Sequence, residues 1–112
     1  MFDDVAPEMT IAREEIFGPV LAVQRFRDVE EAVRVANGTK YGLQACVYTR
    51  DLGTAHALAA RLQCGMVSIN EGPVSFPMTP FGGVKDSGMG REQGIEAAYG
   101  YTRTKTVIAR YG

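Results

Sequence analysis

Between residues 20 and 69 the sequence alternates segments typical of β-strands with segments typical of α-helices. The predicted strands span residues 20–26, 43–49 and 66–69, and the two predicted helices follow the N-cap candidates Asp28 and Asp51. Parallel strands need a long return connection, which a helix provides, and such crossovers are right-handed. The order β-α-β-α-β with short connections therefore predicts an α/β fold built on a parallel sheet.

The first helix has clear start and stop signals. Asp28 and Glu31 form a pair that resembles a capping box, and apolar residues then recur at helical spacing as far as Asn37-Gly38. Before it, residues 20–26 form an apolar, β-branched run that leaves the Gly18-Pro19 turn, which is typical of a strand.

The segment that follows the third predicted strand is rich in glycine and proline. It spans residues 70–90, and in parallel α/β sheets ligands bind at the carboxyl ends of the strands. We therefore expect the binding surface in this segment. Beyond it, residues 91–98 predict a short helix and residues 104–109 a terminal strand.

Composition excludes several classes of partner. The chain has 46% apolar and 22% charged residues and a net charge of −1 with mixed signs, so no surface for nucleic acid or an anionic membrane is predicted. No apolar run approaches the roughly 20 residues that cross a bilayer. The acidic start at Asp3 and Asp4 differs from a secretory signal, which predicts a cytoplasmic location.

The two cysteines and the single histidine lack the spacing of metal ligands. Cys46 falls in a predicted strand and Cys64 at a helix end, so both are predicted to be small buried residues with reduced thiols. His56 is predicted on the surface of the second helix, and no metal is expected.

Glu15 and Phe17 lie two residues apart ahead of the Gly18-Pro19 turn. If the backbone is extended there, both side chains point to the same face. The carboxylate could then accept hydrogen bonds from both hydroxyls of a nicotinamide ribose, and the ring could pack against the nicotinamide or its sugar. The alternative is a solvated glutamate beside a core phenylalanine.

The run from Pro80 to Glu92 has glycines at positions 82, 83, 88 and 90. Glycines commonly serve tight turns, and this run lacks both the P-loop pattern and a Gly-x-Gly-x-x-Gly after a strand, so phosphate binding is disfavoured. We expect Lys85, Ser87 and Arg91 to fix the loop through hydrogen bonds.

Together the runs Glu14–Val20 and Pro80–Glu92, in this order and spacing, resemble the C-terminal part of the NAD(P)-dependent aldehyde dehydrogenase superfamily. The likeness covers residues 13–110. It implies that residues 1–100 are the C-terminal part of a catalytic domain. It also implies that residues 101–112 carry a strand for oligomerisation, so a homo-oligomer is expected.

The resemblance also implies roles for individual residues. Glu15 and Phe17 would hold the nicotinamide end of NAD or NADP, and Phe81 would line the aldehyde channel. Residues 70–79 correspond to the substrate-facing loop, where Ser75 is similar to the hydroxyl with which semialdehyde dehydrogenases bind a distal carboxylate. The alternatives are an aromatic or aliphatic aldehyde, with Ser75 satisfied by local backbone.

By the same resemblance, the intact enzyme would oxidise an aldehyde to a carboxylic acid. That reaction needs a thiolate nucleophile, an oxyanion hole and a glutamate base, and the motifs that carry them are absent from this sequence. No catalytic residue is therefore assigned. One alternative is a stand-alone binding or oligomerisation module without catalysis. Another is an unrelated βαβ nucleotide-binding domain, which is disfavoured because no glycine-rich turn follows the first predicted strand.

Overall fold

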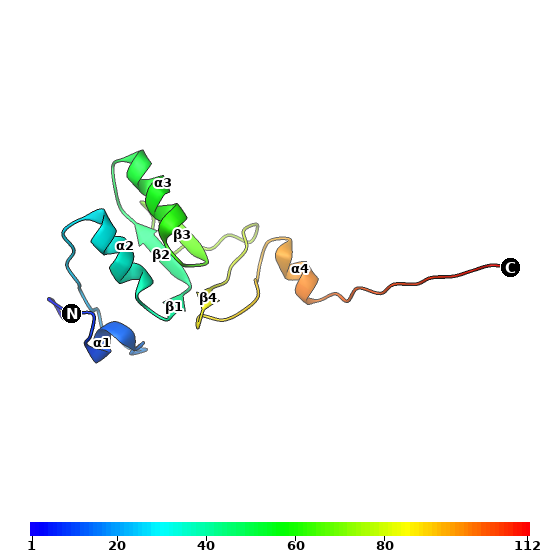
Figure 1. The fold of residues 1–112 in the computed structure, drawn as a ribbon, viewed down its shortest axis with the longest axis horizontal. Helices are drawn as coiled ribbons and strands as arrows, with labels where there is room; N and C mark the ends of the chain where they lie inside the picture. The colour runs from blue at the N-terminus through cyan, green and yellow to red at the C-terminus, as the bar shows by residue number, and fades with distance from the viewer.

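The computed structural model describes residues 1–112, and its short helices and strands are joined by irregular segments (Figure 1). The elements in chain order are α1 (Thr10–Arg13), α2 (Val29–Asn37), β1 (Tyr41–Gly42), β2 (Gln44–Val47), α3 (Leu52–Arg61), β3 (Met66–Ile69), β4 (Val84–Lys85) and α4 (Glu96–Gly100). Helices α2 and α3 lie together beside the β2–β3 pair, and an ion pair between Arg61 and Glu30 joins the two helices.

Helix α2 begins at the predicted N-cap. The Asp28 carboxylate accepts a hydrogen bond from the Glu31 amide at 2.8 Å. The Glu31 carboxylate reaches back to the amide of Arg27 at 2.9 Å and to its guanidinium at 3.0 Å, one residue further than a standard capping box. These hydrogen bonds from Arg27 lower the pKa of Glu31.

The second half of the predicted sheet is confirmed. Strands β2 and β3 pair in parallel from Gln44↔Met66 to Val47↔Ile69, and α3 connects them. Helix α3 starts after the predicted cap, Asp51, whose carboxylate accepts from the Thr54 amide at 2.6 Å. In this part of the chain, the helix cap and the strand pairing therefore both match the prediction.

The prediction that residues 20–26 form the first strand of this sheet is wrong. Residues 20–26 form only an isolated parallel bridge, Phe2↔Ala22, with hydrogen bonds that include Phe2 N to Leu21 O at 2.8 Å. Asp4 has a left-handed φ of 53°, which interrupts the extended run beside the bridge. The β-α-β-α-β arrangement is thus reduced to β2-α3-β3.

An antiparallel pair that the sequence did not predict joins distant segments. Strands β1 and β4 pair through Tyr41↔Lys85 and Gly42↔Val84. Gly42 allows this close approach, because a Cβ at this position would lie 2.8 Å from Cγ2 of Val84, its partner in β4, and 2.6 Å from the Gln63 carbonyl oxygen. This pairing holds the glycine-rich run against the α/β unit.

The predicted helix at residues 91–98 lies further along the chain, at Glu96–Gly100. Gln93 and Gly94 have left-handed φ values of 58° and 59°, which are incompatible with a continuous right-handed helix. The helix therefore begins only after them.

The molecule is elongated and has a small core. Its buried hydrophobic residues are Val5, Val33, Val47 and Ala55. The radius of gyration is 19.1 Å, whereas roughly 13 Å is typical of a domain of this length. None of the helices has the length and hydrophobicity that a membrane-spanning segment needs.

The C-terminal segment beyond α4 extends away from the rest of the chain (Figure 1). The predicted strand at residues 104–109 has no partner within the chain, and Val107 and Ile108 are 76% and 92% exposed. An extended segment with free backbone groups and exposed β-branched side chains is a template for strand pairing.

Replacing Val107 with proline is expected to shift the protein from self-associated forms toward monomer. Proline removes one N–H donor from the edge, while the exposed position leaves the core untouched. Light scattering at protein concentrations of tens of micromolar measures the change. Arg103→Pro, just outside the predicted strand, is the control. Identical monomeric masses for wild type and Val107→Pro would show that this segment is not an assembly element.

Candidate cofactor and substrate site

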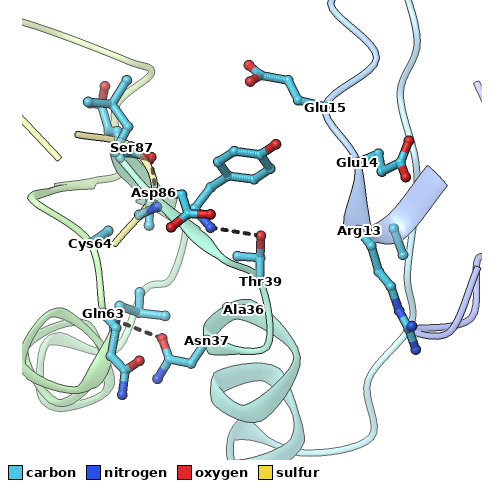
Figure 2. A pocket seen from close by; sticks show the side chains of 17 residues that line it. Arg13, Glu14, Glu15, Ala36, Asn37, Thr39, Gln63, Cys64, Asp86 and Ser87 are labelled. Carbon is cyan, nitrogen blue, oxygen red and sulfur yellow. Dashed lines mark hydrogen bonds between the residues drawn. The ribbon is translucent and has the colours of Figure 1, made fainter. Parts of the chain in front are cut away.

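The segment that carries Glu15 leaves α1 in an extended conformation. Glu14 is the C-cap of α1, with φ −109° and ψ 139°, and its amide donates to the Thr10 carbonyl at 2.9 Å. The Arg13 guanidinium donates to the Pro7 carbonyl at 2.9 Å and points away from the neighbouring cavity, whereas the Glu15 carboxylate points toward it (Figure 2). The end of α1 therefore sets the direction of Glu15.

This cavity, of about 570 Å³, separates the Glu15 segment from the α/β unit (Figure 2). Its far wall comes from the end of α2, strands β1 and β2, the residues that follow α3 and the turn after β4. It includes Asn37, Thr39, Tyr41, Cys64, Asp86 and Ser87. Glu15 is exposed and forms neither a hydrogen bond nor an ion pair in the structure. Its two oxygens are therefore free to accept hydrogen bonds from a ligand.

The backbone at Phe17 differs from the prediction. Phe17 has a left-handed φ of 56°, so the expected extended conformation is wrong at this residue. The tight turn that follows, closed by a 2.7 Å hydrogen bond from the Val20 amide to the Gly18 carbonyl, accompanies this change of direction. Glu15 and Phe17 nevertheless line one hollow of about 290 Å³, and the Phe17 ring is 91% exposed. The Glu15 carboxylate and the Phe17 ring therefore lie on one surface as predicted, although the backbone between them is not extended throughout.

The predicted roles of three polar residues in the glycine-rich loop are confirmed. The Lys85 ammonium donates to the carbonyls of Asn37 and Thr39 at 2.9 and 3.1 Å. Ser87 accepts from the Gly42 amide at 2.9 Å. The Arg91 guanidinium donates to the carbonyl of residue 83 at 2.8 Å and to that of residue 90 at 2.7 Å. All three fix the loop through hydrogen bonds.

Phe81 is half-buried and lines a second cavity of about 710 Å³. Its amide donates to the Glu92 carbonyl at 2.7 Å, and the Glu92 amide donates back at 2.8 Å. Leu43 and Ser87 line both this cavity and the one that contains Glu15. The structure thus places Glu15 and Phe81 in adjacent hollows rather than in one.

Ser75 lies outside both cavities and is exposed. Its hydroxyl donates to the side-chain oxygen of Gln93 at 2.9 Å, so the partner is a distant side chain and not local backbone. Gln93 itself lines the cavity that contains Phe81. Sequence reasoning missed Gln93, because its contact partner Ser75 lies eighteen residues away in the chain and no local spacing relates the two.

The two cysteines have different surroundings. The Cys64 thiol donates to the Met66 carbonyl at 3.0 Å, and burial raises the pKa of this thiol, which disfavours the reactive thiolate. Cys46 is exposed, contrary to the prediction that it is buried. His56 is exposed, and no cluster of three His, Cys, Asp or Glu side chains could hold a metal ion.

Comparison with known proteins accounts for this arrangement of motifs. The sequence model of the aldehyde dehydrogenase family matches residues 1–107. The chain belongs to the aldehyde dehydrogenase family.

Relatives in this family match nearly the whole chain. The mitochondrial aldehyde dehydrogenase of Rattus norvegicus is 49% identical over 110 residues, which are 98% of this chain and 21% of the rat protein. The hydroxyisobutyraldehyde dehydrogenase of Mycolicibacterium austroafricanum is 49% identical over 107 residues, which are 96% of this chain and 21% of that protein.

Solved aldehyde dehydrogenases have the same fold over this region. An NAD+ complex of the aldehyde dehydrogenase from Bacillus cereus superposes with a TM-score of 0.90 at 46% identity, over 94% of this chain and 21% of that one. The chain therefore spans about a fifth of the length of the aldehyde dehydrogenases it matches, and it forms an α/β portion of such a domain.

Proposed function

We propose that this chain forms the nicotinamide-binding edge and one wall of the aldehyde site in an NAD(P)-dependent aldehyde dehydrogenase. That enzyme would convert an aldehyde and water into a carboxylic acid. The observation that carries the proposal is the Glu15 carboxylate, which is directed toward a cavity of about 570 Å³ and has no partner within the chain (Figure 2).

The residues present fit a nicotinamide nucleotide. Two hydroxyls of a ribose are donors, and an unpaired carboxylate offers an acceptor oxygen to each. The exposed ring of Phe17, which lines one hollow with Glu15, offers an apolar face to the nicotinamide or its sugar. When bound, NAD or NADP supplies the hydride acceptor of the oxidation. The NAD+ complex of the related Bacillus cereus enzyme supports NAD as the first cofactor to test.

For the aldehyde, Phe81 would form an apolar wall, and Ser75 and Gln93 would mark its polar end. The Ser75 hydroxyl donates to the Gln93 amide oxygen. A carboxylate on the substrate would take the place of the Gln93 oxygen as acceptor for the Ser75 hydroxyl. It could also accept a hydrogen bond from the amide nitrogen of Gln93. This pair supports a semialdehyde with a distal carboxylate as the substrate class.

Glu15→Gln in the full-length enzyme is expected to slow hydride transfer. An amide offers one acceptor oxygen where the carboxylate offers two, and it removes the charge from both hydrogen bonds. A loss of about 1.5–3 kcal/mol, on the order of tenfold to a hundredfold in rate, is the expected size. Single-turnover measurement of NADH formation checks it.

Glu14→Gln is the matched control, since it makes the same change at the adjacent carboxylate. We expect it to leave the single-turnover rate within about twofold, because removing an exposed surface charge has a small effect. Equal rates for wild type and Glu15→Gln, with normal folding, would identify Glu15 as a surface carboxylate without a cofactor role.

A further inference from the structure

Lys85 connects strand β4 to the end of helix α2. Its ammonium donates to the carbonyls of Asn37 and Thr39, which lie at and just beyond the last residue of α2. The last carbonyls of a helix lack intrahelical partners and carry a partial negative charge, so a cation there is stabilising. A side chain from a distant strand therefore caps α2.

The backbone of Lys85 is in an uncommon conformation. Its φ is 54°, in the left-handed region that non-glycine residues rarely adopt. Such a conformation persists only where surrounding contacts maintain it. The β1–β4 pairing at Tyr41↔Lys85 and the two carbonyl contacts of the ammonium supply these contacts.

A short series of contacts leads from Lys85 to Phe81. Strand β4 follows directly on Gly83, whose carbonyl accepts from the Arg91 guanidinium at 2.8 Å. Arg91 precedes Glu92, which exchanges two backbone hydrogen bonds with Phe81. A displacement of β4 would therefore be transmitted to the Phe81–Glu92 bridge.

We propose that Lys85 is a positioning residue for Phe81. Its ammonium anchors β4 to the end of α2 and so fixes the Phe81 ring as the wall of the aldehyde site. Lys85 lines neither the cavity that contains Glu15 nor the one that contains Phe81, so it acts through Phe81 and does not touch the substrate. The effect on aldehyde binding rests on the proposed function, whereas the effect on the Phe81–Glu92 bridge does not.

The first test is amide hydrogen exchange in the 112-residue chain. In Lys85→Met the amides of Phe81 and Glu92 should exchange on the order of tenfold faster, the size expected when one hydrogen-bonded anchor is lost. The Asn70 amide, which donates to the Val47 carbonyl at 2.8 Å, reports on the β2–β3 region and should be unchanged.

Two variants serve as controls in the same experiment. Lys85→Arg keeps a cationic donor and should retain slow exchange at Phe81 and Glu92. Lys40→Met makes the same change at a lysine whose ammonium lies over the Tyr41 ring and contacts no carbonyl, and it should leave these amides unaffected. Unchanged exchange at Phe81 in Lys85→Met, or equal acceleration there and at Asn70, would overturn the proposal.

The second test uses the full-length enzyme. Lys85→Met should raise the KM for the aldehyde on the order of tenfold, the effect expected from the loss of one hydrogen-bonded contact. The kcat and the KM for NAD should stay within about twofold of the wild-type values. Lys85→Arg should restore the aldehyde KM. A lower kcat with unchanged KM would indicate a loss of folded enzyme and contradict positioning. If the wild-type enzyme oxidises no aldehyde, the proposed function fails, and the exchange experiment still decides the role of Lys85.

Discussion

No NADH formation is expected when the 112-residue chain alone is mixed with NAD and an aldehyde. The oxidation needs a thiolate nucleophile, donors for the oxyanion and a general base in one site. In this chain the Cys64 thiol donates to a backbone carbonyl and has a raised pKa, and the exposed Cys46 thiol has no hydrogen-bonded base. The proposed cofactor-binding residues such as Glu15 cannot replace these groups.

The measurement is NADH absorbance with a panel of aldehydes at high protein concentration. The Bacillus cereus aldehyde dehydrogenase, which is 46% identical over this region, is the positive control for the assay. A double variant with Cys46→Ala and Cys64→Ala sets the background. Turnover by the wild-type chain above this background would contradict the prediction.

Gly65→Ala is expected to destabilise the chain by about 3 kcal/mol or more, at the upper end of what overpacking costs. A Cβ at Gly65 would overlap the carbonyl oxygen of Gly82 and lie 2.8 Å from its carbonyl carbon. Both obstructing atoms belong to the backbone, so no side-chain rotation relieves the clash. The start of β3 and the glycine-rich turn would have to separate.

Chemical denaturation followed by circular dichroism measures the free energy of unfolding. Gly72→Ala is the matched control, because a Cβ at Gly72 meets no atom within 4 Å. We expect its midpoint to remain near that of the wild type. Equal midpoints for Gly65→Ala and Gly72→Ala would show that the close approach of residues 65 and 82 does not limit stability.

Features that depend on local spacing could be predicted from the sequence. Asp28 and Asp51 cap the two longest helices as expected, because an N-cap bonds an amide only three residues away. Strands β2 and β3 lie within the predicted segments, since apolar runs bounded by turn residues indicate strands. The two motif runs likewise identified the family, which the family model confirms.

The tertiary structure alone decided the contacts between segments far apart in the chain. Strand β4 pairs with β1, Lys85 caps α2 from β4, and Ser75 bonds Gln93 across an irregular loop. The left-handed conformation of Phe17 belongs to the same class, because a bulky residue rarely adopts it without a constraint from its surroundings. Sequence spacing carries no signal for such contacts, since they depend on where the chain returns in space. By itself the sequence therefore determined the local elements and the family of this protein, and the tertiary structure determined how the glycine-rich loop is held against them.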